Sequence, residues 1–328
     1  MPKNELNKDQ MIVLGKQVVT LEAEGLFHLA ASLDDYFSAA SGLILNTCRQ
    51  LVVTGLGKSG HIARKIAATF AATGTPAIFV HPSEAGHGDM GMIAQGDVLL
   101  VLSNSGNTPE LQPVMKYARK LGVPIIGMAS GRTSKVIQGA DIALLLPNVR
   151  EACPENIAPT TSTTMQLALG DALAMTVMEM RGVTRKDLRK LHPAGAIGLA
   201  LTPVQEVMAT DQDRLPLVSH QADMPKTISV MTSGCFGLAG VLDDAGRIIG
   251  VITDGDLRRL IEKGLDLRSL SARDAMHPNP RTIRDDALAV EAAEMMELYR
   301  ITSILVVDVR GVLCGAINSN DLMRAKVI

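Results

Sequence analysis

Short apolar runs alternate with longer, helix-patterned stretches between residues 51 and 146. The runs that predict strands are Leu51–Thr54, Ala77–Val80, Val98–Leu102, Pro124–Met128 and Ile142–Leu146. The intervening stretches that predict helices are Ser59–Ala72, Thr108–Leu121 and Thr133–Gln138. This alternation predicts an α/β fold, a doubly wound parallel five-stranded sheet with helices on both faces. Such a sheet binds ligands at the carboxyl ends of its strands.

Helical spacing also marks the segments outside this alternation. Leu14, Val18, Leu21, Gly25 and Leu29 recur three or four residues apart, which predicts a helical segment over residues 1–48. The sheet domain is then expected over residues 49–203. Near its end, the closely spaced Met175, Met178 and Met180 are interpreted as part of a helix core.

An internal repeat follows Pro203. Four residues of its first copy recur 65 residues later in the second copy: Asp243 as Asp308, Gly246 as Gly311, Gly250 as Gly315 and Asp256 as Asp321. Four matches at one constant offset predict two copies of a strand–turn–strand–helix unit that pack as a pair. We place these copies at residues 204–267 and 268–328.

The composition restricts the class of ligand. The chain has 32 Lys and Arg residues against 34 Asp and Glu, a formal net charge of −2, and gives no electrostatic footprint for nucleic acid or an anionic membrane. It has no Trp and only 2% aromatic residues, so it also lacks stacking platforms for single-stranded nucleic acid. A small anionic metabolite fits better, because a few local donors are enough to hold it.

The cysteines and the apolar runs indicate in which cellular compartment the protein is expected. Cys48, Cys153, Cys235 and Cys314 are widely scattered and form no CxxC pair, which argues against a zinc knuckle and a secreted disulfide framework. The N-terminal residues are polar and lack the pattern of a secretion signal. The strongest apolar runs are about five residues long, far below the roughly 20 that a membrane-spanning helix needs. We therefore expect a soluble cytoplasmic protein with no membrane contact.

The first chemistry-bearing segment is Gly55-Leu-Gly-Lys-Ser-Gly60, which follows a predicted strand and opens a predicted helix. It satisfies GxGxxG, but a dinucleotide site needs an acidic residue at the end of the second strand, and the nearest acid is Glu84, beyond Pro82. It is not a Walker A loop either, because no glycine stands five residues before Gly57. The turn brings Lys58, Ser59 and a helix N-terminus together, which favours an anion site over a nucleotide loop or a merely tight turn.

The second segment is Ser103-Asn-Ser-Gly-Asn-Thr-Pro-Glu110, again between a strand and a helix. Ser103, Ser105 and Thr108 can bind phosphate oxygens together with backbone N–H groups. The alternative is an ordinary cap, with Thr108 as N-cap and Pro109 at the first helical position. A cap needs only one hydroxyl, so the two serines favour a phosphate site.

These turns carry a family resemblance. Together with HPSEAGHGD at 81–89, EACP at 151–154, APTTSTT at 158–164, GDALA at 170–174 and HPAGAIG at 192–198, they resemble the sugar-isomerase (SIS) domain of D-arabinose 5-phosphate isomerases. The repeats resemble a CBS pair, through VITDGDLRR at 251–259 and GAINSND at 315–321. The similarity covers nearly the whole chain, with the motifs in the family order. Small departures are Leu191, Ala194 and Thr161, where Ser, Gly and Ser are common.

The resemblance implies interconversion of D-ribulose 5-phosphate and D-arabinose 5-phosphate, the first step toward the lipopolysaccharide and capsule sugar Kdo. It also implies a homotetramer with active sites at subunit boundaries. The positions that match the family's site fall into three groups. They are Lys58, Glu110, Glu151 and His192 as catalytic residues, His87 as a residue lining the site, and Ser59, Ser103, Ser105 and Thr108 as phosphate-binding residues.

An aldose–ketose isomerase moves a proton between C1 and C2 through an enediol. Glu151 can serve as the base if partial burial raises its pKa, and His192 can open the ring or move hydroxyl protons, because imidazole titrates near neutral pH. Lys58 can stabilise the enediolate or hold the phosphate. His87 and Asp89 could attract a divalent metal, but enediol chemistry does not require one. We expect no cofactor, and we treat any metal as incidental or inhibitory.

For the repeats, the resemblance suggests an adenine-nucleotide or sugar-nucleotide effector, with Thr253 and Asp256 as ribose-binding candidates and Asp321 as their counterpart in the second copy. Asn318 occupies the Thr position there, which suggests one degenerate cleft. A purely structural role in tetramer assembly is the alternative.

Two alternatives concern the protein as a whole. One is a non-catalytic regulator that senses a sugar phosphate, although the first 48 residues show no basic recognition helix. The other is an isomerase of another phosphosugar. The sequence does not distinguish a housekeeping enzyme from capsule-linked or sugar-alcohol-linked paralogues.

Overall fold

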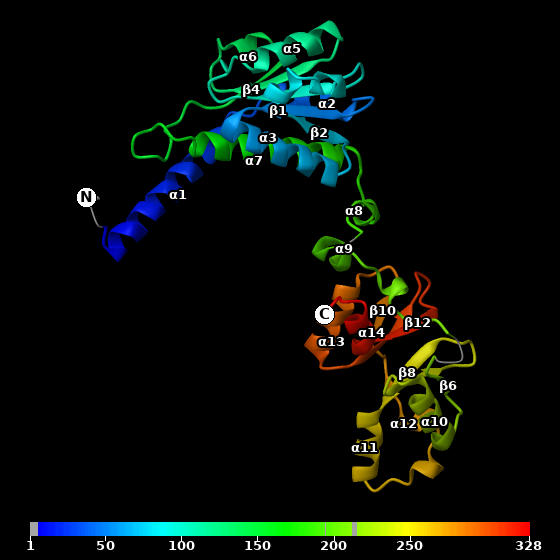
Figure 1. Cartoon of the computed structure of the whole chain (residues 1–328). Coiled ribbons are helices and arrows are strands. Elements are labelled where there is room, and N and C mark those ends of the chain that lie inside the picture. Colours follow the sequence, from blue (N-terminus) through cyan, green and yellow to red (C-terminus); the bar gives the residue numbers. More distant parts are fainter. Residues whose placement is uncertain (1–5, 194, 212–214) are drawn as a thin grey trace. The chain divides into compact units, whose positions relative to one another are not determined.

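The structure of the chain is a computed structural model, which describes residues 6–193, 195–211 and 215–328 (Figure 1). The chain divides into two compact units, Met1–Leu191 and His192–Ile328. Within the described residues, no helix is long and apolar enough to cross a membrane.

A five-stranded sheet forms the centre of the first unit, in the order β2-β1-β3-β4-β5. Its strands are β1 (Leu51–Gly55), β2 (Ala77–Val80), β3 (Val98–Leu102), β4 (Ile125–Ala129) and β5 (Ile142–Leu145). All four pairings are parallel. The predicted five-stranded parallel sheet is therefore confirmed, and every strand end lies within one residue of its predicted position.

Helices cover both faces of this sheet, as Figure 1 shows. One face packs against α3 (Gly57–Ala72) and α7 (Thr161–Met180); the other packs against α4 (Pro82–Ala85), α5 (Leu111–Lys120) and α6 (Lys135–Gln138). Side chains alternate between the two cores, so Val53 joins the α3 side and Val52 the α5 side. Because both faces are covered, β1 and β3 are buried along their whole length.

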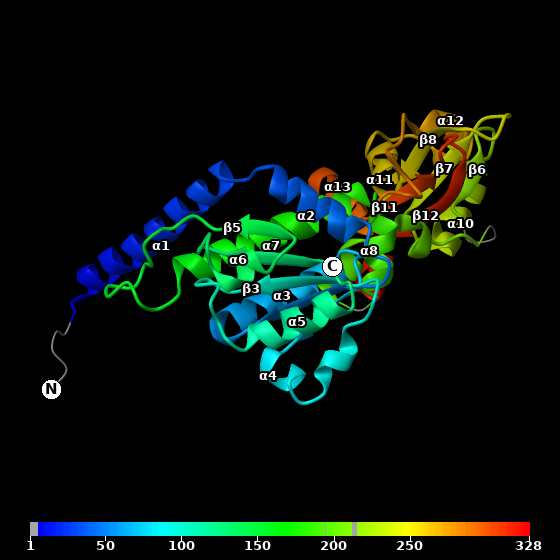
Figure 2. The same ribbon diagram turned by 90° about the horizontal axis from the view of Figure 1, so that it is seen from above.

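Two helices precede the sheet, α1 (Lys8–Ala31) and α2 (Asp35–Leu45), and confirm the helical pattern of the N-terminal segment. A capping box between Asn7 and Gln10 begins α1. Near its other end Gly25 lies directly against Thr161, so the helix packs closely on the start of α7. Figures 1 and 2 show the N-terminal half of α1 extending away from the sheet.

Helices α3 and α7 run parallel to each other. Gly170 packs against Ile66, Lys65 forms an ion pair with Asp171, and the Arg181 Nε atom donates to the Thr75 hydroxyl at 3.1 Å. From the pairs at Lys65 and Ile66 to the Thr75–Arg181 contact just beyond the helix ends, both segments advance in the same direction, so the two helices begin at the same edge of the sheet. That edge is the carboxyl edge of the strands, because α3 directly follows β1. After α7, α8 (Arg185–Leu191) ends the first unit.

The second unit begins with α9 (Ala196–Ala200) and contains two small sheets. The first, β6-β7-β8-β9, has strands Leu217–Ser219, Leu238–Leu242, Ile248–Thr253 and His277–Pro278; the second, β10-β11-β12, has Thr282–Arg284, Ser303–Val307 and Leu313–Asn318. Their helices are α10 (Met224–Gly234), α11 (Asp254–Glu262), α12 (Ala272–Ala275), α13 (Ala289–Tyr299) and α14 (Ser319–Arg324). Phe236, Leu238, Leu305 and Ala316 form a core shared by both sheets.

The internal repeat is confirmed in its details. β7, β8 and α11 match β11, β12 and α14, and the pairing Val241↔Gly250 has its equivalent in Val306↔Gly315. Gly246 and Gly311 both adopt the left-handed conformation, with φ of 75° and 77°. The aspartates before them bind the turns, since Asp243 accepts from the Arg247 N–H and Asp308 from the Val312 N–H, each at 2.8 Å.

Candidate active site and effector cleft

The sheet of the first unit reverses its direction of winding between β1 and β3. These strands are adjacent, yet β2 lies on one side of the pair and β4 and β5 on the other. The loops that follow β1 and β3 therefore diverge at the carboxyl edge, and open α/β sheets of this kind bind ligands in the crevice at such a switch point. Lys58 and Ser59 follow β1, and Ser103, Ser105, Thr108 and Glu110 follow β3. The structure thus brings both predicted anion-binding segments to the same crevice.

The β1–α3 turn depends on two glycines. Gly57 has a φ of 58°, a conformation that other residues adopt at a cost. A Cβ atom at Gly60 would lie 2.6 Å from the Gly55 carbonyl oxygen, so only glycine lets α3 begin this close to β1. The result is a helix N-terminus that has no side-chain cap and points its free N–H groups at the crevice. Lys58 is exposed in its first turn.

The loop after β3 is organised by Ser103. Its side chain is buried, its Oγ atom accepts from the Gly106 N–H at 3.0 Å, and it forms a 2.9 Å hydrogen bond with the Thr108 hydroxyl. Ser105 is exposed. Ser103 and Thr108 therefore hold the loop in shape, whereas Ser105 presents its hydroxyl at the surface.

The alternative in which Thr108 caps the following helix is wrong. Helix α5 begins at Leu111, with Glu110 at the N-cap position and no side-chain cap. The physical reason is the Ser103 hydroxyl, which engages Thr108 and draws it toward the strand. The helix therefore begins three residues later than the predicted Thr108, and Glu110 is exposed at its start.

Glu151 lies in the long loop between β5 and α7, where it caps α7. Its Oε2 atom accepts from the N–H groups of Thr160 at 2.8 Å and Ser162 at 3.1 Å, and from the Thr160 hydroxyl at 3.2 Å. The loop is closed by Asn156, whose side chain accepts from the Glu151 N–H at 2.7 Å and whose φ is 52°. Because α3 and α7 begin at the same edge, Glu151 and Lys58 share the carboxyl edge of the sheet.

The electrostatic environment of Glu151 differs from the expectation. Burial acts to raise its pKa, but the hydrogen bonds from Ser162 and Thr160 outweigh burial, and the pKa lies below its ordinary value of 4.5. The idea that burial raises the pKa of Glu151 is therefore wrong. The side chain is a carboxylate at neutral pH, stabilised by the N-terminus of α7.

Two other predicted residues, His87 and His192, lie in different units of the chain. His87 is exposed in the loop after β2, the strand next to β1, and so belongs to the same edge. His192 is the first residue of the second unit. His87 and Asp89 form no metal site in the part of the chain that the structure describes, where no three His, Cys, Asp or Glu side chains converge.

The second unit contains a cleft of about 770 Å³ between its two repeats. Its lining includes the four arginines Arg258, Arg259, Arg281 and Arg300, and Asp254 is its one acidic lining residue within the described chain. The Arg281 guanidinium stacks on the Tyr299 ring at 3.3 Å. In the repeat, Arg258, Arg281 and Arg300 correspond to Met323, Pro216 and Cys235, whereas Arg259 corresponds to Arg324, so three of the four arginines have no basic counterpart in the other copy.

The predicted effector residues fall partly on this cleft. Thr253 lines it, but Asp256 does not. Instead, the Asp256 carboxylate accepts from the Thr253 hydroxyl and N–H and forms an ion pair with Arg259 at 2.6 Å. Asp321 has the same capping role, with Asn318 as its partner. Both aspartates are thus committed to helix starts.

Several residues of these sites were not predicted. Thr160 and Asn156 hold Glu151, and the four arginines line the cleft. The arginines come from three separate segments of the sequence, so no local pattern marks them. Asn156 had a weak signal, since asparagine is favoured at positive φ in a loop.

Comparisons with known families and structures agree with this architecture. The SIS domain family matches residues 44–176, and the CBS domain family matches residues 204–263 and 272–328. Fold and site together define a protein with an SIS domain followed by a CBS pair.

Curated relatives match nearly the whole chain. Arabinose 5-phosphate isomerase KdsD of Pseudomonas aeruginosa is 42% identical over 314 residues, which cover 95% of this chain and 96% of the relative. Its counterpart in Escherichia coli K12 is 41% identical over 315 residues, or 96% of this chain and 95% of the relative. The chain therefore belongs to the arabinose 5-phosphate isomerase KdsD family.

A solved structure resembles the first unit. The E. coli CFT073 protein c3406, solved in complex with arabinose 5-phosphate, is 36% identical, with a TM-score of 0.56, and its whole length matches 57% of this chain.

Proposed function

We propose that this protein interconverts D-ribulose 5-phosphate and D-arabinose 5-phosphate through an enediol, and so supplies a precursor of Kdo. The observation that carries the proposal is the switch point between β1 and β3, where the N-terminus of α3 with Lys58 and the Ser103 loop begin at the same edge of the sheet. Full-length similarity to arabinose 5-phosphate isomerase KdsD supports the choice of substrate.

The phosphate is proposed to bind at the start of α3 and at Ser105. Uncapped N–H groups and the positive end of the helix stabilise a dianion there. Ser59 extends this donor set, while Ser103 and Thr108 keep the loop in its binding shape. Holding the phosphate fixes C1 and C2 of the open-chain sugar against the catalytic groups.

Proton transfer is proposed to use Glu151 as the base, with Lys58 stabilising the enediolate. The family resemblance gives His192, the first residue of the second unit, the role of acting on ring and hydroxyl protons. Within the described residues, the Thr160 N–H and hydroxyl and the Ser162 N–H all donate to Oε2 of Glu151, and we propose Oε1 as the atom that takes the substrate proton. The lowered pKa keeps this group ionised and ready to accept a proton. Glu110 and His87, exposed at the same edge, complete the proposed site.

A substrate panel tests this proposal. Purified protein is treated with a chelator and offered pentose and hexose phosphates, and the products are identified by NMR. We expect turnover of the two pentose phosphates only. Preference for another phosphosugar, or binding with no turnover of any, would favour the alternative isomerase or the regulator.

The active form is proposed to be a homotetramer. Support comes from α1, whose exposed side chains include Met11, Ile12, Val13, Val19 and Phe27, the last 76% exposed. Light scattering of the wild type should give the mass of four chains, and Phe27→Lys should reduce it. A monomeric, active wild type would contradict this part of the proposal.

The cleft of the second unit is proposed to bind a nucleotide or sugar-nucleotide effector. Guanidinium groups suit phosphates, and Arg258 and Arg300 line the cleft, whereas Arg259 is paired with Asp256 and Arg281 covers the face of Tyr299. Calorimetry with ATP, AMP and CMP should detect binding that Arg258→Met weakens, because Met323 stands at the equivalent position of the other repeat. Lys263→Gln, at the exposed end of α11, is the control. No binding of any nucleotide would favour the purely structural role.

The protein is proposed to work in the cytoplasm. All four of its cysteines are free thiols, which suits a reducing compartment.

A further inference from the structure

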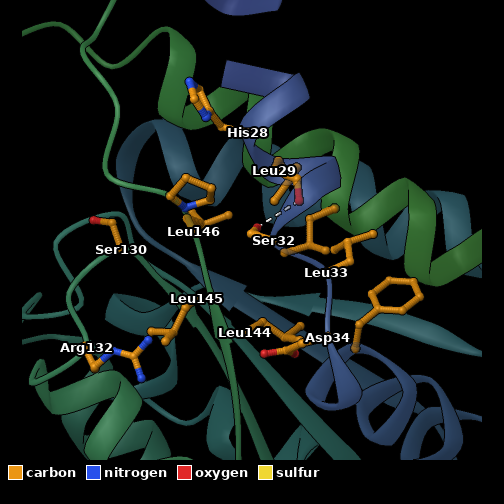
Figure 3. A pocket seen from close by; sticks show the side chains of 13 residues that line it. His28, Leu29, Ser32, Leu33, Asp34, Ser130, Arg132, Leu144, Leu145 and Leu146 are labelled. Atoms are coloured by element: carbon orange, nitrogen blue, oxygen red, sulfur yellow. Dashed lines mark hydrogen bonds between the residues drawn. The ribbon is translucent and has the colours of Figure 1, made fainter. Parts of the chain in front are cut away.

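A second cavity lies in the first unit, apart from the crevice between β1 and β3. It has a volume of about 320 Å³, is partly open to solvent, and is lined by the end of α1, the turn into α2, the end of β5 and the loop after β4 (Figure 3). The volume is within the range of sites for small metabolites. Its floor is apolar and is formed by Leu144, Leu145, Leu146 and Leu29.

The polar side chains of this cavity come from two sides. Arg132 and Ser130 come from the loop after β4, whereas Asp34 and His28 come from the α1–α2 side. In Figure 3 the Arg132 and Asp34 side chains extend toward the same space. Within the described chain, no ion pair joins them, and neither Arg132 nor His28 has a side-chain hydrogen-bond partner. Asp34 uses Oδ1 to cap α2 through the Tyr36 N–H, so Oδ2 is available to accept.

The cavity is directly linked to the phosphate loop. Ser130 forms part of its wall, and both the N–H and the hydroxyl of Ser130 donate to the Asn104 carbonyl, at 3.0 and 2.7 Å. Asn104 stands between Ser103 and Ser105. The next residue, Gly131, packs against the Ser105 carbonyl, since a Cβ atom there would lie 3.1 Å from it. Any ligand that moves Ser130 or Arg132 therefore acts on the loop proposed to bind substrate.

We propose that this cavity is a regulatory site for a small phosphorylated or carboxylated polyol. Arg132 would bind the anionic group, and guanidinium groups are well suited to both phosphate and carboxylate. Asp34 would accept hydrogen bonds from hydroxyl groups, and the leucine floor would cover the C–H face of the ligand. Occupancy would change the affinity for substrate through the Ser130–Asn104 contact. This coupling rests on the proposed function, whereas the binding site itself does not.

The test uses the full-length protein with ¹⁵N-labelled histidine. The His28 imidazole resonance is assigned from its loss in His28→Asn, and sn-glycerol 3-phosphate, glycerate and L-alanine are titrated in turn. We expect saturable shifts with glycerol 3-phosphate or glycerate, whichever anion the site prefers, and loss of these shifts in Arg132→Gln. Arg310→Gln, which removes an exposed arginine in the second unit, should leave them unchanged.

Kinetics provide the second readout. A saturating polyol anion should change KM for the sugar phosphate by about fivefold, a typical coupling between two sites, and Arg132→Gln should remove this change with little effect on basal turnover. The proposal is overturned if the His28 resonance does not shift with either polyol anion. That result would mean that the cavity binds neither anion at any concentration tested or that a second copy of the chain covers it. The proposal is also overturned if only alanine binds, or if Arg132→Gln responds like the wild type. Because the NMR shifts need no turnover, an inactive protein that shows them would contradict the proposed function and leave the site intact.

Discussion

The carboxylate of Glu151 is held by backbone N–H groups at the start of α7 rather than by a basic side chain. One residue thus fixes the start of a 20-residue helix and supplies the proposed catalytic base. A depressed pKa makes it a weaker base, and the compensation is a group that is ionised at neutral pH and well oriented. Two consequences at the scale of this residue can be measured.

The first concerns catalysis. Glu151→Gln keeps the shape of the side chain but removes the basic oxygen, so turnover should fall by roughly a hundredfold or more, with KM nearly unchanged. Exchange of the substrate C1 proton with deuterated water should slow equally. His192→Asn should slow overall turnover more than exchange on open-chain substrate. Near-normal exchange in Glu151→Gln would assign the base to Glu110 or His192.

The second concerns stability. The pKa of Glu151 is lowered in the folded state, so its ionised form stabilises the fold above the unfolded-state pKa of about 4.5, and this contribution is lost as the pH falls through the folded-state pKa. Urea unfolding should show Glu151→Gln less stable than the wild type by about 1 kcal/mol near pH 7, with a smaller difference near pH 3. Glu155→Gln, an exposed change in the same loop, should show neither effect. A difference that grows at low pH would contradict the assignment.

The sequence predicted which residue types gather at this site but not how each is held. Lys58, Ser105 and Glu110 follow apolar runs, and the topology of a parallel sheet places such residues at one edge. The partners of Glu151 could not be predicted, because Asn156 reaches it only when the loop closes at a positive φ. The Ser103–Thr108 hydrogen bond also forms only in the folded loop, so the sequence pattern alone suggested that Thr108 caps the next helix.

At the scale of elements, the approach of α3 to β1 determines the shape of the proposed phosphate site. Gly60→Ala would place a methyl group 2.6 Å from the Gly55 carbonyl oxygen, so α3 must shift. We expect a loss of about 1–3 kcal/mol in the free energy of unfolding and a higher KM, because Lys58 and Ser59 move with the helix.

Gly15→Ala is the matched control for this change. Gly15 is exposed in α1 and a Cβ there meets no atom within 4 Å, so alanine should add about 0.5–1 kcal/mol of stability. Unfolding by urea and steady-state kinetics measure both variants. A Gly60→Ala protein with wild-type stability and KM would show that the close contact is not required.

Strand positions were predictable because buried parallel strands form continuous apolar runs, as in Val98–Leu102. The buried face of a helix was harder to predict from the sequence. Met175 and Met180 were assigned to a helix core, but they are 42% and 49% exposed, because α7 buries the face formed by Met165, Leu169 and Leu173 instead. An apolar side chain on a helix does not by itself indicate which face is buried.

At the scale of the whole molecule, we predict that the chemistry resides in residues 1–203. The proposed phosphate and proton-transfer residues all precede Pro203, and the CBS pair follows it. A protein truncated after residue 203 should keep measurable turnover, whereas truncation after residue 191 removes His192 and should abolish it. If a folded, tetrameric 1–203 protein is inert, the CBS pair contributes to the active site.

The central claim is that this chain equilibrates D-ribulose 5-phosphate with D-arabinose 5-phosphate using its own side chains. The most direct test is ¹H and ³¹P NMR of chelator-treated full-length protein with D-ribulose 5-phosphate in deuterated water. We predict that D-arabinose 5-phosphate forms to equilibrium, with deuterium at the carbon that exchanges its proton with the base, and without added metal or nucleotide. Complete inactivity that is restored only by a metal ion or NAD would contradict the account.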